Sequence, residues 1–294
     1  MESPALELNV GLKRETCYLL SRHWENQGAM RSSASSTMAA RPWRHAAGAL
    51  DRAKYLRPIA HRGLHDRTKG RIENTAPAFL AAIHKGYGIE CDLQAANDGT
   101  PMVFHDDKLD RLMGAPGRIS QHTPASLAPL RYKGQDTHIL TFAEFLALVG
   151  GRVPLLVEVK TNSATPLHPF LDRIARQARA YKGPIALMSF DLDVVAALAK
   201  LAPTIPRGPV IGLPARWWAA PRAAGSATIA RLLNRTPPGS GFLAVDVKML
   251  RAARAWMTRH AIDLPLFSWT IRTRRERATA TRFADAPIFE RYEA

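Results

Sequence analysis

From Arg57 onward, short apolar runs alternate with segments of helical pattern, an arrangement typical of strand–helix units and a parallel sheet. Nine runs are candidates for strands, and at least six helices separate them. Because 294 residues can accommodate one barrel of about 250, the pattern predicts a (β/α)8 barrel with one accessory strand. A doubly wound open sheet is the alternative, but its usual glycine-rich phosphate loop, GxGxxG or GxxxxGKS/T, does not occur. The strand candidates are residues 58–61, 88–93, 101–105, 154–160, 185–190, 208–212, 242–247, 264–270 and 287–289.

Local signals mark where several helices begin. Two capping boxes, in which a threonine precedes a glutamate by three residues, predict helices that start at Thr141 and Thr273. A third predicted helix carries Pro166 in its first position. A fourth follows Asn74 and Thr75, which are interpreted as its capping residues.

Residues 1–56 lack this alternation. Their serine-rich, arginine-containing composition resembles a transit peptide, while a wrongly chosen start codon, with Met30 or Met38 as the true start, is equally compatible. No apolar run in this part is long enough for the core of a secretory signal. We therefore expect residues 1–56 to be a poorly ordered basic extension with a short helix around residues 43–55, followed by the barrel domain at 57–294.

Composition limits the location and the partners. The two cysteines, Cys17 and Cys91, are too few for a disulfide framework or a CxxC metal site, so we expect a reducing, cytoplasmic location. Lys and Arg number 41 against 25 Asp and Glu, a formal net charge of +16. Such a charge favours anionic partners: nucleic acid, an anionic membrane surface or a phosphorylated small molecule. Charge alone does not choose among them.

The chemistry is concentrated at strand ends. Catalytic groups of a barrel gather at the carboxyl ends of its strands, where a buried strand has no structural use for acids, imidazoles or lysine. Four strand candidates in succession end in such groups. The segments are His61-Arg62-Gly63, Glu90-Cys91-Asp92, His105-Asp106 and Glu158-Val159-Lys160. Because side chains alternate along a strand, Glu90 and Asp92 share one face and Cys91 takes the other.

The third of these runs is expected to form a hairpin with the second. Residues 97–100 read Asn-Asp-Gly-Thr, and Asp98-Gly99 suits a two-residue type I′ turn. That turn would set Asp92 directly across from His105, with Cβ atoms about 5 Å apart. If the run is instead a regular parallel strand, the two residues still converge at the mouth of the barrel.

The strand-end residues supply the parts of a metal site. The carboxylates of Glu90, Asp92 and Glu158 form an all-oxygen donor set, which suits Mg²⁺ or Ca²⁺ rather than Zn²⁺. His61 and His105 are candidates for general acid and base, because the pKa of an imidazole lies near neutrality.

Two cations accompany these groups. Arg62 and Lys160 would hold a phosphoryl group, the first as a fork and the second as a point charge. Alternatively, Glu158 and Lys160 form a structural ion pair at the top of the barrel. A metal, two proton carriers and two anion ligands together indicate a phosphodiester hydrolase.

The order of these motifs resembles the glycerophosphodiester phosphodiesterase family over roughly residues 57–291. The resemblance implies an irregular TIM barrel that uses a metal to hydrolyse glycerophosphodiesters to an alcohol and sn-glycerol 3-phosphate. It places the catalytic histidines on His61 and His105, the metal ligands on Glu90, Asp92 and Glu158, and a small insertion after the third strand at about 107–140. The motifs that carry it are His61-Arg62-Gly63, Glu73-Asn74-Thr75, Glu90-x-Asp92, Asp98-Gly99, His105-Asp106, Glu158-Val159-Lys160, Ser189-Phe190 and Trp269-Thr270.

One departure from the family pattern lies near the end of the chain. The family usually closes with an Asp-Gly-hydrophobic-Thr-Asp run, and here residues 285–290 read Asp-Ala-Pro-Ile-Phe-Glu. Glu290 would stand in for the final aspartate. We expect this change to affect the last loop and to touch no proposed catalytic residue.

Three further residues are expected around the site. Trp269 forms a wall of the substrate pocket or, alternatively, part of the core. Glu73 is interpreted as supporting the metal ligands from behind; the alternatives are a direct metal ligand or a loop residue that hydrogen-bonds near the start of the helix. Asp106 orients His105 or a turn. The eight remaining histidines, His65 and His84 among them, are expected at the surface.

The acid-free stretch between Asp193 and Asp246 suggests a membrane contact. Trp217 and Trp218 lie within it, among basic residues, so it is either a flap that touches an anionic lipid surface or a solvated basic helix. The same site would also suit a lysophospholipase D that acts on lipid phosphodiesters. A basic nucleic-acid-binding barrel without activity is disfavoured, because the acids and histidines are present at every expected strand end.

Overall fold

The structure is a computed structural model that describes residues 48–162, 164–212 and 226–294. These residues all belong to one compact unit, Met38–Ala294. The expectations for residues 1–47 and for Trp217 and Trp218 lie outside the described residues.

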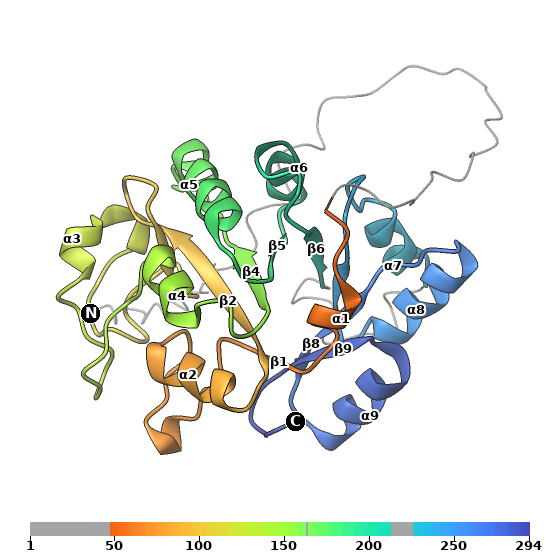
Figure 1. The fold of residues 1–294 in the computed structure, drawn as a ribbon, viewed down its shortest axis with the longest axis horizontal. Coiled ribbons are helices and arrows are strands. Elements are labelled where there is room, and N and C mark those ends of the chain that lie inside the picture. Colours follow the sequence, from red (N-terminus) through yellow and green to blue (C-terminus); the bar gives the residue numbers. More distant parts are fainter. Residues whose placement is uncertain (1–47, 163, 213–225) are drawn as a thin grey trace, which may run out of the picture. The chain divides into compact units, whose positions relative to one another are not determined.

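Eight parallel strands close into a barrel (Figure 1). The first strand of the barrel pairs with both the second and the last, and this double pairing closes the sheet. The predicted barrel with one accessory strand is therefore confirmed, and the open sheet is excluded. The barrel strands are β1 (Ile59–Ala60), β2 (Gly88–Ala95), β4 (Leu155–Val159), β5 (Ile185–Ser189), β6 (Arg207–Ile211), β7 (Leu243–Asp246), β8 (Leu266–Ile271) and β9 (Ala286–Phe289); β3 (Pro101–Val103) is the accessory strand.

Helices lie between the strands and cover the outside of the barrel (Figure 1). Both predicted capping boxes are present, at Thr141 and at Thr273. Pro166 was expected in the first turn of its helix but is the N-cap, so that helix begins one residue later. The helices are α1 (Arg52–Tyr55), α2 (Ala76–His84), α3 (Pro124–Leu127), α4 (Phe142–Val149), α5 (Leu167–Ala180), α6 (Leu192–Leu201), α7 (Ser226–Leu233), α8 (Leu250–Arg259) and α9 (Arg274–Phe283), with short 3₁₀ turns at Arg67–Lys69 and Ile119–Gln121.

The hairpin of β2 and β3 is antiparallel as predicted, but its register is wrong by one residue. The backbone N–H of Phe104 donates to the carbonyl of Asp92, so Phe104 and not His105 lies across from Asp92. The loop contains three residues, 97–99, and Gly99 takes a left-handed conformation with φ of 80°. A three-residue turn that ends in a left-handed glycine adds one residue to the expected two and therefore shifts the pairing.

Two apolar clusters show which way each strand faces. Ile89, Cys91 and Leu93 of β2 pack in the large cluster between the strands and the helices. The smaller cluster contains Leu156 of β4 and inward-facing residues of the other strands, and it fills the inside of the barrel. Because side chains alternate, the remaining residues of β2 point into the barrel.

The chain before β1 closes the inner cluster. Leu50 and Tyr55 are buried and pack with the residues inside the barrel. This packing differs from the expectation of a poorly ordered extension up to residue 56, because apolar side chains that join a core hold their backbone in place. The expected short helix is present as α1 within the described part of this segment.

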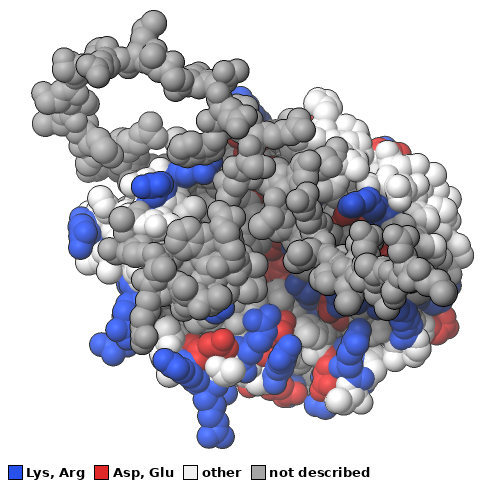
Figure 2. All heavy atoms as spheres, turned by 180° about the vertical axis from the view of Figure 1, so that it is seen from behind, with Lys and Arg blue, Asp and Glu red and all other residues white. Residues whose placement is uncertain are grey.

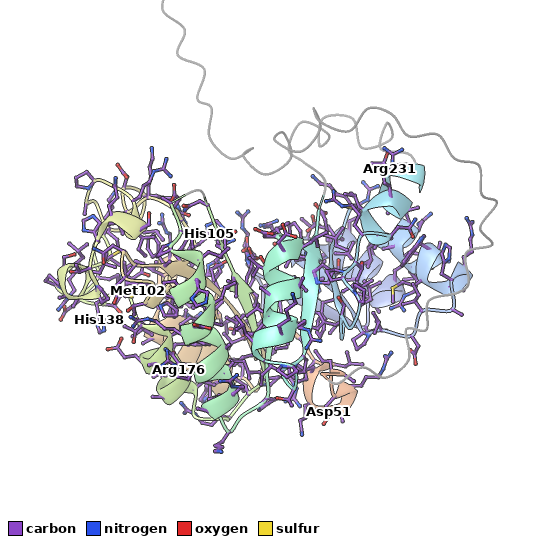
Figure 3. The ribbon with its side chains drawn as sticks, turned by 90° about the horizontal axis from the view of Figure 1, so that it is seen from above. Asp51, Met102, His105, His138, Arg176 and Arg231 are labelled. Atoms are coloured by element: carbon purple, nitrogen blue, oxygen red, sulfur yellow. The ribbon has the colours of Figure 1, made fainter. Side chains whose placement is uncertain are left out.

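The segment between β3 and α4, residues 104–141, has a small core of its own. Phe104, Leu109, Leu112 and Tyr132 pack there with apolar residues from the β2–β3 hairpin. His138, labelled in Figure 3 beside Met102 of β3, belongs to this segment. The segment carries functional side chains on loops that are anchored by this cluster.

Among the residues that the structure describes, no helix combines the length and the hydrophobicity needed to cross a bilayer.

Candidate active site

An acidic cluster lies at the carboxyl ends of β2 and β4. Glu90 and Asp92 face into the barrel because Cys91 between them faces the helices. Asp92 is the register partner of Glu158 on the neighbouring strand, so these two carboxylates are adjacent on the same face. One oxygen from each of the three residues lies within 4.8 Å of the others, and all three residues are buried. The cluster brings together the three predicted metal ligands.

The electrostatics of the cluster favour a bound cation. Burial, followed by the charges of Asp92 and Glu158, raises the pKa of Glu90 well above its usual range. Burial also opposes ionisation of Asp92, but Lys160 and then His105, with other nearby cations, lower the pKa of that carboxyl. Oxygen Oε1 of Glu90 is buried and has no hydrogen-bond partner. A buried, unpartnered carboxylate oxygen beside two other acids fits a hard divalent cation.

Two basic side chains contact the same acids. Lys160 Nζ donates to Glu158 and lies 3.1 Å from Oδ1 of Asp92. Arg62 Nε lies 3.2 Å from Oδ2 of Asp92, and the backbone N–H of Arg62 donates to Oε2 of Glu90 at 2.9 Å. The Glu158–Lys160 ion pair, which the sequence left as an alternative, is thus present. Both cations therefore lie at the acidic cluster.

The turn after β1 requires glycine at one position. Arg62 and Gly63 both adopt positive φ, of 54° and 78°. A Cβ atom on Gly63 would come within 2.9 Å of Ala78 and Phe79 in α2, so a larger residue would push the helix away. This close turn aims the backbone N–H of Arg62 at Glu90.

Asn74 belongs to the site rather than to a helix cap. Its Nδ2 donates to Oδ2 of Asp92 at 2.8 Å, and its backbone N–H donates to the carbonyl of Arg62 at 2.9 Å. Thr75 precedes α2 as expected, but its hydroxyl donates to the carbonyl of Ile72 and makes no cap. Thr75 thus occupies the expected N-cap position without a side-chain cap, and the capping interpretation of Asn74 is wrong because its amide binds Asp92.

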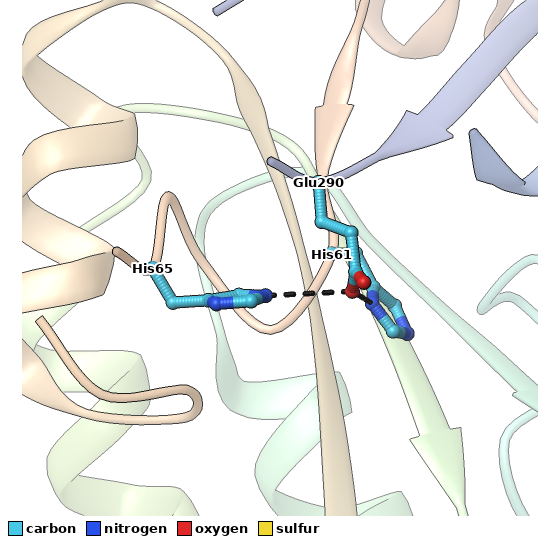
Figure 4. A group of neighbouring side chains, drawn as sticks. All are labelled: His61, His65 and Glu290. Carbon is cyan, nitrogen blue, oxygen red and sulfur yellow. Dashed lines mark hydrogen bonds and ion pairs between the residues drawn. The ribbon is translucent and has the colours of Figure 1, made fainter. Parts of the chain in front are cut away.

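His61 follows β1 and is held from behind by Glu290, which follows β9. His61 Nδ1 lies 2.6 Å from Oε2 of Glu290 (Figure 4). Its Nε2 lies 3.9 Å from Oε2 of Glu90. The expectation that Glu290 touches no proposed catalytic residue is therefore wrong. Burial lowers the pKa of His61, and the hydrogen bond to Glu290 opposes this shift.

Further basic groups contact Glu290. His65 Nε2 lies 3.4 Å from the same oxygen, so His65 is part of this cluster and not a surface residue as expected (Figure 4). Arg272 Nε donates to the other oxygen, Oε1, at 2.7 Å. Burial alone would raise the pKa of Glu290, but the hydrogen bonds from His61 and Arg272, together with the nearby ring of His65, lower it.

His105 has a carboxylate partner as well. Its Nδ1 lies 2.7 Å from Oδ1 of Asp106 (His105 is labelled in Figure 3). Arg111 donates through Nη2 to both Asp106, at 2.8 Å, and Glu73, at 2.7 Å. Glu73 also accepts a hydrogen bond from Arg62 at 2.7 Å. A continuous chain of charged contacts therefore links Arg62 to His105.

These contacts shift the pKa of both acids downward. Burial opposes the shift, but hydrogen bonds and charges from Arg111 and Arg62 lower the pKa of Glu73 to about 2. Asp106 has a lowered pKa, despite burial, because His105 and Arg111 hydrogen-bond to it. Both carboxylates are thus held in their ionised form by the basic side chains that contact them.

Trp269 is a half-buried residue of β8. Its ring packs edge to face on Phe190, with centroids 5.4 Å apart, and its Nε1 donates to the carbonyl of Ala244 at 3.2 Å. A Cβ atom on Gly212 would approach the indole ring to 2.8 Å, so the glycine makes room for it. Phe190, which follows β5, is 49% exposed and forms an apolar edge with Trp269 of β8.

Sequence reasoning missed Arg111, His65 and the role of Asn74. Arg111 and His65 follow the His105 and His61 motifs by a few residues, but nothing in their own spacing distinguishes them from surface residues. Glu290 was noticed only as a departure from the family pattern, because its partner lies at the other end of the barrel domain.

The fold is a barrel with an acidic cluster at the carboxyl ends of its strands and with two histidines that each contact a carboxylate. These features define a class of barrel site that binds anionic groups. Residues 61–288 match the model of the glycerophosphoryl diester phosphodiesterase family. The chain belongs to this family.

Individual relatives agree with this assignment. The probable glycerophosphodiester phosphodiesterase 1 of Mycobacterium tuberculosis is 30% identical over 173 residues, a match that covers 50% of this chain and 61% of that protein. The chain thus matches less than two thirds of this relative's length. The glycerophosphodiester phosphodiesterase of Thermotoga maritima superposes with a TM-score of 0.58 at 21% identity, covering 80% of this chain and 94% of that one. A phosphodiesterase of Oleispira antarctica, solved with the product sn-glycerol-3-phosphate, gives a TM-score of 0.63 at 20% identity and covers 79% and 92%.

Proposed function

We propose that the chain hydrolyses glycerophosphodiesters to an alcohol and sn-glycerol 3-phosphate, with Mg²⁺ or Ca²⁺ as cofactor. One observation carries the proposal: the buried cluster of three carboxylates lies beside His61, and Nδ1 of that ring is held by the carboxylate of Glu290. Family membership and the product bound to the Oleispira antarctica relative support the substrate class.

Glu90, Asp92 and Glu158 would hold the cation. Carboxylate oxygens are the ligands of hard cations, which favours Mg²⁺ or Ca²⁺ over softer metals. When bound, the cation neutralises charge on the phosphoryl oxygens in the transition state. Asn74 fixes the orientation of Asp92, so the ligand is in place before the substrate arrives.

His61 and His105 would move the protons. Each ring is held at Nδ1 by a carboxylate, Glu290 for His61 and Asp106 for His105. A ring that donates from Nδ1 to a carboxylate keeps Nε2 as the nitrogen that exchanges protons with the substrate. One histidine takes a proton from the nucleophile, and the other protonates the departing alkoxide.

Arg62 and Lys160 would pair with the phosphoryl group, and Trp269 would line the pocket. Both cations already contact the acidic cluster, so a phosphoryl group placed at that cluster meets them without large movements. Glu73 holds the guanidinium of Arg62 at 2.7 Å and keeps it near the site.

The test is product analysis on a panel of glycerophosphodiesters. We expect release of sn-glycerol 3-phosphate that stops with EDTA and returns with Mg²⁺ or Ca²⁺. Hydrolysis that is unaffected by EDTA, or absence of sn-glycerol 3-phosphate with every substrate, contradicts the proposal.

The apolar edge of Phe190 and Trp269 favours one second candidate, a lysophospholipase D. An exposed phenylalanine near the site suits an acyl chain better than it suits water. Comparison of lysophosphatidylcholine with glycerophosphocholine separates the two activities. The contact of Trp217 and Trp218 with an anionic membrane remains a prediction, and so does the cytoplasmic location.

A nucleic-acid partner is not part of the proposal. Where the face in Figure 2 is drawn in colour, the Lys and Arg side chains are interspersed with Asp and Glu. A nucleic-acid-binding surface usually has its basic side chains clustered on one face.

A further inference from the structure

A second group of potential metal ligands lies beside the acidic cluster. One ligand atom each from His61, His65 and Glu290 lies within 4.8 Å of the other two. The carboxylate of Glu290 stands between the two imidazole rings, and its Oε2 is 2.6 Å from one ring and 3.4 Å from the other (Figure 4). None of these three residues is a member of the acidic cluster of Glu90, Asp92 and Glu158.

The donor set of this group differs from that of the acidic cluster. Two imidazoles and one carboxylate suit Zn²⁺ and similar transition metals, whereas three carboxylates suit Mg²⁺ or Ca²⁺. Ligand atoms around a tetrahedral zinc ion stand about 3.3 Å apart, given bond lengths of about 2.0–2.1 Å. The 3.4 Å pair already has this separation, and the 2.6 Å pair has to open by less than about 1 Å.

Two further observations point to a ligand at this position. Nε2 of His65 is buried and makes no hydrogen bond of good geometry, although it faces Glu290. Arg272 binds the other oxygen of Glu290, so the carboxylate is fixed with Oε2 turned toward both rings. A buried, unpartnered imidazole nitrogen aimed at a fixed carboxylate is arranged as a metal ligand would be.

The group is also accessible. It lines a cavity of about 830 Å³ that lies between the turn after β1 and the chain after β9. The cavity gives an ion a path from solvent and leaves room for the water that completes the coordination of a three-ligand zinc site.

We propose that His61, His65 and Glu290 form an inhibitory site for Zn²⁺, separate from the site of the hard cation. Zinc would take the place of the proton between Nδ1 of His61 and Glu290, and that proton would pass by exchange with solvent to Nε2 of the same ring, which stays neutral. A neutral ring with zinc on Nδ1 and its one proton on Nε2 cannot accept another proton. Binding would therefore remove His61 from proton transfer; this inhibitory effect rests on the proposed function, whereas zinc binding itself does not.

Zinc binding is tested by titration calorimetry on the full chain with saturating Mg²⁺, which keeps the acidic cluster filled. We expect about one Zn²⁺ per chain in the wild type and at least about tenfold weaker binding in His65→Gln, since one of three ligands is lost. His84→Gln is the matched control, because His84 is an exposed residue on α2. Equal zinc affinity in the wild type and in His65→Gln overturns the site.

The inhibitory effect is tested by turnover of glycerophosphocholine at saturating Mg²⁺ and increasing Zn²⁺. The concentration of Zn²⁺ that halves the rate is expected to rise at least about tenfold in His65→Gln and to stay unchanged in His84→Gln. Each rate is expressed relative to the rate of the same variant without zinc, so the comparison does not depend on the zinc-free rate of His65→Gln. Zinc binding that leaves the wild-type rate unchanged overturns the inhibitory role. If no glycerophosphodiester is hydrolysed, the proposed function fails while the calorimetric result still decides the zinc site.

Discussion

Oε2 of Glu290 lies 2.6 Å from Nδ1 of His61, although 229 positions separate the two residues in the sequence. The last strand of the barrel brings them together: β9 pairs with β1, and the backbone N–H of His61 donates to the carbonyl of Phe289 at 2.9 Å. The carboxylate that orients the first histidine of the domain therefore comes from its final strand.

Glu290→Gln is expected to lower kcat by about 10–100-fold with little change in KM, because the ring of His61 loses the charge that orients it and stabilises its protonated form. Steady-state kinetics measures both constants. Glu290→Asp is expected to recover part of the loss, since it restores the charge. Glu293→Gln serves as the control, because Glu293 makes an exposed ion pair with Lys85. A change confined to KM would show that Glu290 acts on substrate binding instead.

His61→Ala and His105→Ala are each expected to lower turnover by about 10²–10⁴-fold, the usual effect of losing a general acid or base. The rate of sn-glycerol 3-phosphate release measures the effect, and circular dichroism shows that the variants are folded. His84→Ala, at an exposed position, is expected to leave the rate unchanged. Rates within about threefold of the wild type for both variants would refute their role as proton carriers.

Removal of the divalent cation is expected to lower thermal stability. A ligand that binds only the native state adds about 2.7 kcal/mol to the free energy of unfolding at 100 times its Kd. Thermal unfolding with EDTA, and then with Mg²⁺ or Ca²⁺ added back, measures this gain.

Glu90→Gln is expected to abolish that gain and to raise the stability of the cation-free protein. Burial and the neighbouring acids raise the pKa of Glu90, so its charged form is unfavourable in the folded state. This penalty is absent below the ordinary pKa of a glutamate and grows as the pH rises toward the raised pKa. A variant that keeps the full cation-dependent increase in melting temperature would place the cation elsewhere.

Glu73 is expected to make stability depend on pH in the acidic range. Its pKa is lowered from 4.5 to about 2, so its ionised form favours the folded state. The resulting stabilisation is complete above pH 4.5 and is lost as the pH falls from there through about 2. Glu73→Gln should lower the free energy of unfolding at neutral pH by about 1–3 kcal/mol. Urea unfolding at several pH values should show this difference shrinking on acidification; a difference independent of pH would mean that Glu73 acts through packing.

The fold and the acidic cluster could be predicted because they depend on local periodicity. Alternation along β2 places Glu90 and Asp92 on one face and Cys91 on the other, and this does not depend on contacts with other segments of the chain. Apolar runs and capping boxes are likewise read from a few neighbouring residues.

The remaining parts of the site depend on contacts that a local pattern does not encode. The register of the hairpin changed with one extra loop residue, a choice that Asp98-Gly99 leaves open between turn types. Glu290 reaches His61 only because the barrel closes, and Arg111 reaches Glu73 only because the segment 104–141 folds over the strand ends. Such long-range pairs become visible once the strands are placed.

The pairing of β1 with β9 has a consequence for how the protein is made. A chain emerging from the ribosome completes β2 and β4, and with them its acids, well before the final strand is synthesised. Until that strand arrives, the first imidazole has no carboxylate behind it and the sheet has an open edge. Nascent or truncated molecules that lack β9 would therefore be inactive in the proposed hydrolysis. Activity would begin only after the last strand has been synthesised.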